Sequence, residues 1–153
     1  MITDDLEALE HIKGEHIRLL LDNIFEDKSG DLLYVYKIYL KDKYSPIGRL
    51  TFRLGESEEI QLLGHIGFFI HKKNRGHNYA KQATALVLAF LSGYGVDNLL
   101  MTADETNIAS NKIARDLGGE CVKQIQIPHK IQTTSTFQTV GKCVKNVYKL
   151  TLK

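Results

Sequence analysis

The chain has 153 residues, of which 43% are hydrophobic and 25% charged. This composition is typical of a globular protein with its own apolar core, and the length suits a single domain over residues 1–153. A formal net charge of +2 excludes a polybasic nucleic-acid-binding protein, so we expect no nucleic-acid partner.

The longest apolar stretch, residues 83–91, is about half the length needed to cross a membrane, and the acidic N-terminal segment does not resemble a signal peptide. Cys121 and Cys143 have neither metal-site nor disulfide-framework spacing, so we expect reduced thiols and no metal. These observations together predict no membrane association and a cytoplasmic location.

Apolar patterning in the first half of the chain predicts a short helix followed by four strands. Leucine and isoleucine recur at helical spacing near the N-terminus. The segment from Leu32 to Leu40 is rich in β-branched and aromatic residues and is the clearest strand. Short polar turns separate it from its neighbours, which indicates an antiparallel meander. We expect the helix within residues 2–15 and the strands at residues 17–21, 32–40, 50–54 and 60–71.

The second half of the chain alternates between helices and strands. Apolar residues at helical spacing predict helices at residues 79–94 and 108–117. Asn107 is a good N-cap for the second helix, and the glycine pair that begins at Gly118 ends it. The order ββββ-α-β-α-ββ predicts a mixed α/β fold. We expect strands at residues 98–103, 121–127 and 142–152, and a long polar hairpin loop at the threonine-rich residues 132–139.

The predicted strand that ends at His71 runs into a loop of small and basic residues, and a helix begins directly after this loop. Backbone N–H groups in the first turn of a helix lack intrahelical partners and carry partial positive charge, so such a junction binds anions. Gly76 permits a left-handed backbone, and Asn78 tolerates it better than other non-glycine residues. These features predict a phosphate-binding loop, with a solvated basic turn as the alternative. The surrounding cations are Lys72, Lys73, Arg75 and Lys81.

Residues 73–80, KNRGHNYA, resemble motif A of the GNAT N-acetyltransferase superfamily, R/Q-x-x-G-x-G/A. Residues 107–119, NIASNKIARDLGG, are similar to its motif B. The resemblance implies a GNAT fold, in which helices flank a mixed, mostly antiparallel sheet of about seven strands. It also implies acetyl-CoA or CoA as cosubstrate, with the pyrophosphate held by loop amides and the pantetheine arm paired with the preceding strand. The cofactor-binding residues so implied are Phe69, Ile70, Lys73, Arg75, Gly76, His77, Asn78, Tyr79, Ala80, Asn107 and Ser110.

Residues 64–68, GHIGF, extend the resemblance to one subgroup of the superfamily. They are similar to the GHIGY segment of a little-characterised bacterial GNAT subgroup. Two positions depart from the family pattern. Asn78 stands where motif A has glycine or alanine, and its side chain takes space near a phosphate. Ala114 stands where many members carry a tyrosine that protonates the departing thiolate. That step is left to water, to Ser110 or to a tyrosine from elsewhere, such as Tyr148.

His65 is the candidate general base, because acetylation needs a neutral amine and a histidine titrates near neutrality. Some members of the superfamily carry a glutamate at a comparable place on this strand. The alternative is a structural histidine whose ring nitrogens bond to neighbouring strands. Tyr34, Tyr36 and Tyr39 are expected to be sheet residues, with a place in the acceptor pocket as the alternative.

The motifs and the resemblance together predict an acetyl-CoA-dependent N-acetyltransferase, an acyltransferase that modifies a primary amine of a small molecule or peptide by direct attack in a ternary complex. The alternative is a non-catalytic CoA-binding or regulatory module with the same fold, which the departures at Asn78 and Ala114 keep open. A nucleotide-binding loop is disfavoured because G-x-x-x-x-G-K-[S/T] is missing. A homodimer is the default expectation for assembly.

Overall fold

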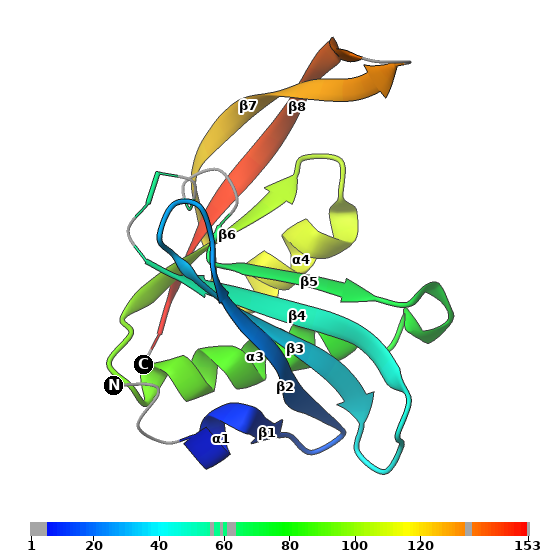
Figure 1. Cartoon of the computed structure of the whole chain (residues 1–153), viewed down its shortest axis with the longest axis vertical. Helices are drawn as coiled ribbons and strands as arrows, with labels where there is room; N and C mark the ends of the chain where they lie inside the picture. Colours follow the sequence, from blue (N-terminus) through cyan, green and yellow to red (C-terminus); the bar gives the residue numbers. More distant parts are fainter. Residues whose placement is uncertain (1–5, 56, 59, 61–63, 134–135, 153) are drawn as a thin grey trace.

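The computed structural model contains one large sheet with helices packed against it (Figure 1). It describes residues 6–55, 57–58, 60, 64–133 and 136–152. The strands in this part of the chain are β1 (His11–Lys13), β2 (Ile17–Glu26), β3 (Leu32–Leu40), β4 (Pro46–Leu54), β5 (Ile66–Ile70), β6 (Asn98–Asp104), β7 (Glu120–Thr133) and β8 (Thr136–Thr151). The helices are α1 (Leu6–Glu10), α3 (Tyr79–Ser92), α4 (Ile108–Asp116) and the short 3-10 helix η2 (Lys72–Asn74).

The sheet is mixed and mostly antiparallel, as the family resemblance implies. Its strand order is β1-β2-β3-β4-β5-β6-β8-β7, and only β5 and β6 are parallel neighbours among the described strands. The meander has the predicted order, and β3 has the predicted bounds. The helices of the second half are confirmed to within a turn: α4 has Asn107 as its N-cap, and Gly118 follows it with φ 86°.

Two predicted elements are too long. The N-terminal helix covers only Leu6–Glu10, because the chain leaves the helix at His11 to pair with β2. The expected strand at residues 60–71 is wrong in its first half. Gly64 has φ 75° and donates its N–H to the carbonyl of Ile60 at 2.8 Å, and the strand begins only at Ile66. Residues 2–5 and 61–63 lie outside the described residues.

The predicted polar hairpin loop is also wrong. β7 and β8 pair out to Thr133 opposite Thr136, with register shifts between Cys121 and Lys123 and between His129 and Lys130, so the described part of this segment is strand. The two strands form a long ribbon that extends away from the rest of the molecule (Figure 1). Threonine favours extended backbone, and an antiparallel ladder satisfies its own backbone hydrogen bonds without a core beneath it. A polar composition therefore did not distinguish loop from strand here.

The core consists of two clusters. The larger lies between β1–β5 and α3, and the smaller joins β6 and β8 to α4. Phe68 of β5 packs against both, so β5 is the strand at which the two halves meet. Burying one such apolar side chain contributes about 1.5–3 kcal/mol, which makes these clusters the main force holding the helices on the sheet. In the described part of the chain no helix is long and apolar enough to span a bilayer.

The tyrosines of β3 divide between the two faces of the sheet. Tyr34 and Tyr36 are buried against Phe52, with ring centroids 4.6 and 5.6 Å from it. The Tyr36 hydroxyl donates to the carbonyl of Leu9 at 2.7 Å, and burial raises the pKa of Tyr36. Tyr39 points to the other face, where the Arg18 guanidinium lies 4.6 Å from its ring. Tyr34 and Tyr36 are therefore core residues of the sheet.

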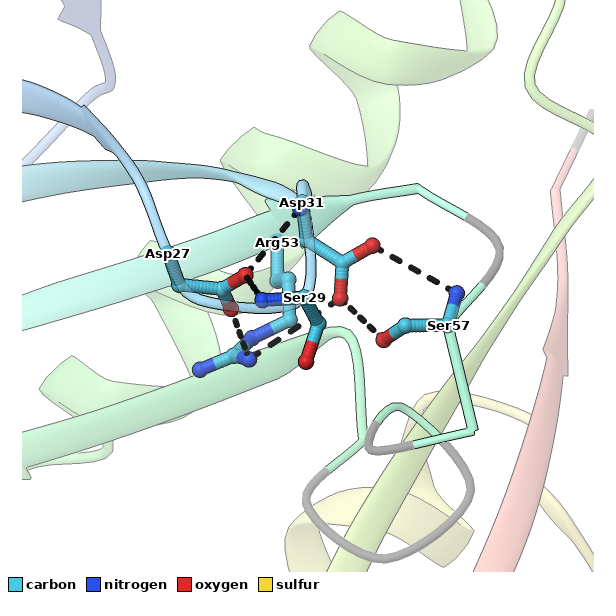
Figure 2. Close-up of polar contacts among 5 residues, drawn as sticks. All are labelled: Asp27, Ser29, Asp31, Arg53 and Ser57. Carbon is cyan, nitrogen blue, oxygen red and sulfur yellow. Dashed lines mark hydrogen bonds and ion pairs between the residues drawn. The ribbon is translucent and has the colours of Figure 1, made fainter.

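A polar cluster fixes the turn between β2 and β3 to the end of β4 (Figure 2). Asp27 accepts the N–H groups of Ser29 and Asp31 at 2.9 and 3.1 Å and forms an ion pair with Arg53. The buried Asp31 carboxylate accepts the hydroxyl of Ser57 and lies 4.0 Å from Arg53. Backbone N–H of Arg53 in turn donates to the carbonyl of His65 at 2.6 Å. The cluster thereby anchors the segment from which β5 begins.

Candidate functional site

The site is centred on β5, where the sheet opens. β5 pairs with β4 along its whole length, but with β6 only at Ile66 opposite Met101. The N–H of His71 donates to Ile47 of β4 at 2.8 Å, so by strand alternation the main-chain groups of Phe68 and Ile70 point toward β6. No described strand pairs with that edge of β5 beyond Ile66. The divergence is visible in Figure 1 and leaves this edge open to a ligand's amide groups.

The loop after β5 has the backbone that the sequence predicts. Gly76 has φ 89°, and Asn78 has φ 61° and ψ 23°, the only described non-glycine residue with positive φ. The first bond of α3 runs from Gln82 N–H to the carbonyl of Asn78 at 3.0 Å. The preceding N–H groups of the helix, from Tyr79 on, therefore have no intrahelical acceptor. Combined with the helix dipole, they form a site suited to a phosphate.

A cavity of about 320 Å³ joins this loop to the open edge of β5 and to α4. Most of its lining was predicted from sequence, although the residues come from three separate elements. Phe69 and Ile70 come from β5, Arg75 and Ala80 from the loop and α3, and Asn107 and Ser110 from the start of α4. The remaining lining residues are Phe68, Ala109 and Ile113.

The other predicted residues, Lys73, Gly76, His77, Asn78 and Tyr79, are not among the described residues that line the cavity. Lys73 is exposed in η2, and His77 stacks on Tyr79 with ring centroids 5.3 Å apart.

Arg75 is held in place, because its Nε donates to the carbonyl of Ile70 at 2.9 Å and its guanidinium lies 5.3 Å from the Phe69 ring. Its remaining N–H groups are available to a phosphate. In the described residues, no group of three or more His, Cys, Asp or Glu side chains could hold a metal.

Motif B supplies a cap and a buried network. Asn107 accepts the N–H of Ser110 on its side-chain oxygen at 3.1 Å, which fixes the first turn of α4. Asn111, which sequence reasoning did not single out, is buried and donates to the carbonyls of Asp104 and Asn107 at 2.8 and 2.7 Å. The hydroxyl of Tyr148 donates to Asn111 at 2.6 Å. Tyr148 is thus committed to this network, whereas Ser110 lines the cavity.

His65 joins β5 to β6. Its backbone N–H donates to the carbonyl of Leu100 at 2.7 Å, and its ring Nδ1 accepts the N–H of Leu100 at 2.8 Å. A neutral ring that accepts at Nδ1 carries its proton on Nε2. Burial lowers the pKa of His65 below its ordinary value of 6.5, with the Asp31 carboxylate acting in the opposite direction. This is the bonding expected of a structural histidine, and His65 is not among the described residues that line the cavity.

The lowered pKa of His65 predicts a loss of stability in mild acid. The unfolded chain binds more protons near and below the ordinary pKa of 6.5, so the free energy of unfolding falls as the pH drops through this value toward the lower folded-state pKa. His11, whose pKa is lowered by burial and then by Lys13 and Arg18, adds to this slope. His65→Asn keeps an oxygen acceptor for Leu100 but does not titrate, so urea unfolding should show a shallower pH slope. An unchanged slope would contradict the assignment of this acid sensitivity to His65.

The left-handed backbone at Asn78 makes a second stability prediction. Asn78→Ala should lose about 1–2 kcal/mol, because alanine resists this conformation, whereas Asn78→Gly should retain the stability of the original chain. The Asn78 side chain forms no capping bond whose loss could explain a difference. Chemical denaturation of the two variants measures the effect, and equal losses in both would show that the conformation at this position is not left-handed.

The family model for the acetyltransferase (GNAT) domain matches residues 6–120, which is most of the chain. Comparison with curated protein sequences found no match. The solved structures similar to this chain include a probable acetyltransferase of the GNAT family from Chromobacterium violaceum, with 16% identity and a TM-score of 0.63 over 93% of this chain and 86% of that one.

Two further structures contain a coenzyme. RimL, a ribosomal L7/L12 α-N-protein acetyltransferase in complex with coenzyme A, is 13% identical over 94% of this chain and 98% of its own, with a TM-score of 0.64. The microcin C7 self-immunity acetyltransferase MccE, in complex with acetyl-CoA and AMP, is 15% identical with a TM-score of 0.58. That match covers 78% of this chain and 61% of MccE. At these identities the likeness concerns the fold, and it agrees with the family match: the chain belongs to the acetyltransferase (GNAT) family.

Proposed function

We propose that the protein transfers the acetyl group of acetyl-CoA to a primary amine of a small molecule or peptide, by direct attack within a ternary complex. The observation that carries the proposal is the cavity that brings the open edge of β5, the N-terminus of α3 and the first turn of α4 together. GNAT membership sets the reaction class. RimL, by its name, acts on a protein α-amino group, which supports a peptide N-terminus as one acceptor class.

The residues fit a CoA thioester. The N–H groups at the start of α3, with Arg75 beside them, suit a diphosphate, whereas Lys81 forms an ion pair with Asp116 at 3.5 Å. The open main-chain groups of Phe68 and the N–H of Ile70 suit the amides of a pantetheine arm, which bind an exposed strand edge as another strand would, while the Ile70 carbonyl is already occupied by Arg75. The Asn78 side chain takes space in this loop, at a position where motif A has glycine or alanine. Because Asn78→Gly removes that side chain, this variant is expected to bind CoA more tightly than the unmodified chain.

The chain's contribution to the reaction is mainly alignment. Fixing the amine beside the thioester lowers the barrier by several kcal/mol. The N–H of Phe68 points into the opening and can stabilise negative charge on the thioester oxygen as it forms. Ser110 lines the cavity, so it or water is better placed than Tyr148 to protonate the departing thiolate.

The attacking amine must lose a proton, and two roles for His65 are compatible with this requirement. The predicted role is that of general base, acting directly or through water. The bond from Leu100 to Nδ1 favours the structural role instead, because the neutral ring then presents N–H rather than a lone pair at Nε2. The pH–rate profile of His65→Asn separates the two. Loss of the acidic limb with retained stability supports the base, and an unchanged profile supports the structural role.

The test of the proposed function is a pair of measurements on the intact chain. Calorimetric titration with acetyl-CoA and CoA measures cofactor binding, and release of free thiol with a panel of primary amines measures turnover. Binding together with amine-dependent thiol release is the expected result. Tight binding without release on any amine would favour the non-catalytic CoA-binding module. Membership of the GHIGY-like bacterial subgroup, a homodimer and a cytoplasmic location stay predictions.

A further inference from the structure

One face of the sheet is uncovered beside the proposed site. Along β2–β5, the residues facing α3 form the core, and the alternate residues face away from it. We call this second surface the open face. It is crossed by a row of directly paired residues, one from each strand: Leu20, Lys37, Arg49 and Phe69. In the described part of the chain no helix packs over this row, and β2–β5 lie in front of α3 in Figure 1.

The open face is continuous with the cofactor cavity. Two hollows lie on it, of about 610 and 320 Å³, and both include Arg49 and Phe69 in their lining. Phe69 also lines the cavity between β5 and α4, and Phe68 lines that cavity and the larger hollow. The proposed thioester position and the open face are therefore separated only by β5. An amine that reaches the opening beside β5 can extend across the open face toward β4.

The two cations in this row differ in whether they have an acidic partner. Lys37 forms an ion pair with Asp22 at 3.5 Å, so its charge has a partner. The side chain of Arg49, which is exposed and directly opposite Lys37 in the register, forms no hydrogen bond or ion pair with any described residue. Like charges directly opposite each other on neighbouring strands are unfavourable. A bound anion would relieve this repulsion, and a guanidinium binds carboxylate or phosphate through two parallel bonds.

We propose that the acceptor is a small amine that carries an anionic group, a carboxylate or a phosphate, and that Arg49 binds this group on the open face. This inference rests on the proposed acetyltransferase function. Arg49 lies one strand from β5, and strands are spaced about 4.8 Å apart, so the amine and the anion are separated by roughly 5–10 Å. A short ω-amino acid or a phosphorylated amino alcohol has this length. Arg49 is thus a specificity determinant and takes no part in proton transfer.

The experiment compares matched amines that differ only in the anionic group. 4-Aminobutyrate is paired with 4-aminobutanamide, and phosphoethanolamine with ethanolamine, and kcat/KM is measured for each by thiol release. The original chain should favour the anionic member of at least one pair by about 10-fold or more. Arg49→Gln should abolish most of this preference through KM while the affinity for CoA stays unchanged. The pair with the larger Arg49-dependent ratio identifies carboxylate or phosphate. Lys41→Gln, an exposed cation that lines neither of the two hollows with Arg49, is the control and should keep the preference.

Equal use of charged and neutral amines by the original chain, or a preference that survives Arg49→Gln, would overturn the proposal. Failure of the acetyltransferase function itself gives a different result, in which no amine releases thiol. In that case calorimetry with the CoA-bound protein decides the inference. Arg49-dependent binding of 4-aminobutyrate or phosphoethanolamine supports the anion site, and no binding of either compound contradicts it.

Discussion

Gly48→Ala is expected to destabilise the protein by about 1–3 kcal/mol and to weaken CoA binding as well. Gly48 is buried in β4 opposite Ile70 of β5. A methyl group at this position would overlap the carbonyl oxygen of Phe69 and lie 3.0 Å from the Cα of Ile70. Both contacts are with backbone, which cannot rotate away as a side chain can. The second half of β5 must shift, and with it the main-chain groups proposed to bind the pantetheine arm.

Gly67→Ala is the matched control for this prediction. Gly67 also lies in the β4–β5 pair, but a methyl group there would meet only the Thr51 hydroxyl at 3.4 Å, an ordinary contact. Urea unfolding should therefore show a loss for Gly48→Ala and none for Gly67→Ala, and titration with CoA should show weaker binding only in the first. If Gly48→Ala unfolds and binds like the original chain, β4 and β5 are not as close as described.

Asn111→Leu is expected to lower the free energy of unfolding by about 2–4 kcal/mol, although the leucine side chain has the same number and branching of heavy atoms as asparagine. The substitution removes two bonds to backbone carbonyls and leaves the Tyr148 hydroxyl without its acceptor. The side chain of Asn146, which donates to the same Asn111 oxygen at 2.8 Å, also loses its partner. These groups are partly or fully buried, so water does not fully replace the lost bonds.

The control for Asn111→Leu is its exposed neighbour on α4. Lys112→Ala breaks an exposed ion pair with Asp116, which should cost no more than about 1 kcal/mol. Thermal or urea unfolding distinguishes the two variants. A loss at Asn111 no larger than that at Lys112 would show that the network does not hold α4 to β8.

Features encoded by local residue chemistry could be predicted from sequence. Asn107 caps α4 and Gly118 ends it because the preferences for these positions belong to the residues themselves. The loop at Gly76 and Asn78 was found for the same reason, since few other residues take up a left-handed backbone. Six of the predicted residues meet in one cavity because the motifs stand at the ends of neighbouring elements.

Features that depend on partners distant in the sequence could not be predicted. The sequence predicts strands at residues 121–127 and 142–152 but a loop at residues 132–139, because a polar composition fits either state and only pairing between the two arms decides. Asn111 gains its role from Tyr148 and Asn146, which lie far along the chain. Arg49 stands out only in the register that sets it opposite Lys37 and beside Phe69. A single sequence carries no direct signal for such juxtapositions.

The most direct test of the account is calorimetric titration of the intact chain with CoA and, separately, with pantetheine, which lacks the diphosphate and the adenosine. The amides at the start of α3 are proposed to bind the diphosphate, and each charge-assisted bond contributes about 1.5–3 kcal/mol. CoA should therefore bind at least ~10-fold more tightly than pantetheine. Equal affinity for the two compounds, or no binding of CoA, would contradict the proposal that this loop is a diphosphate site.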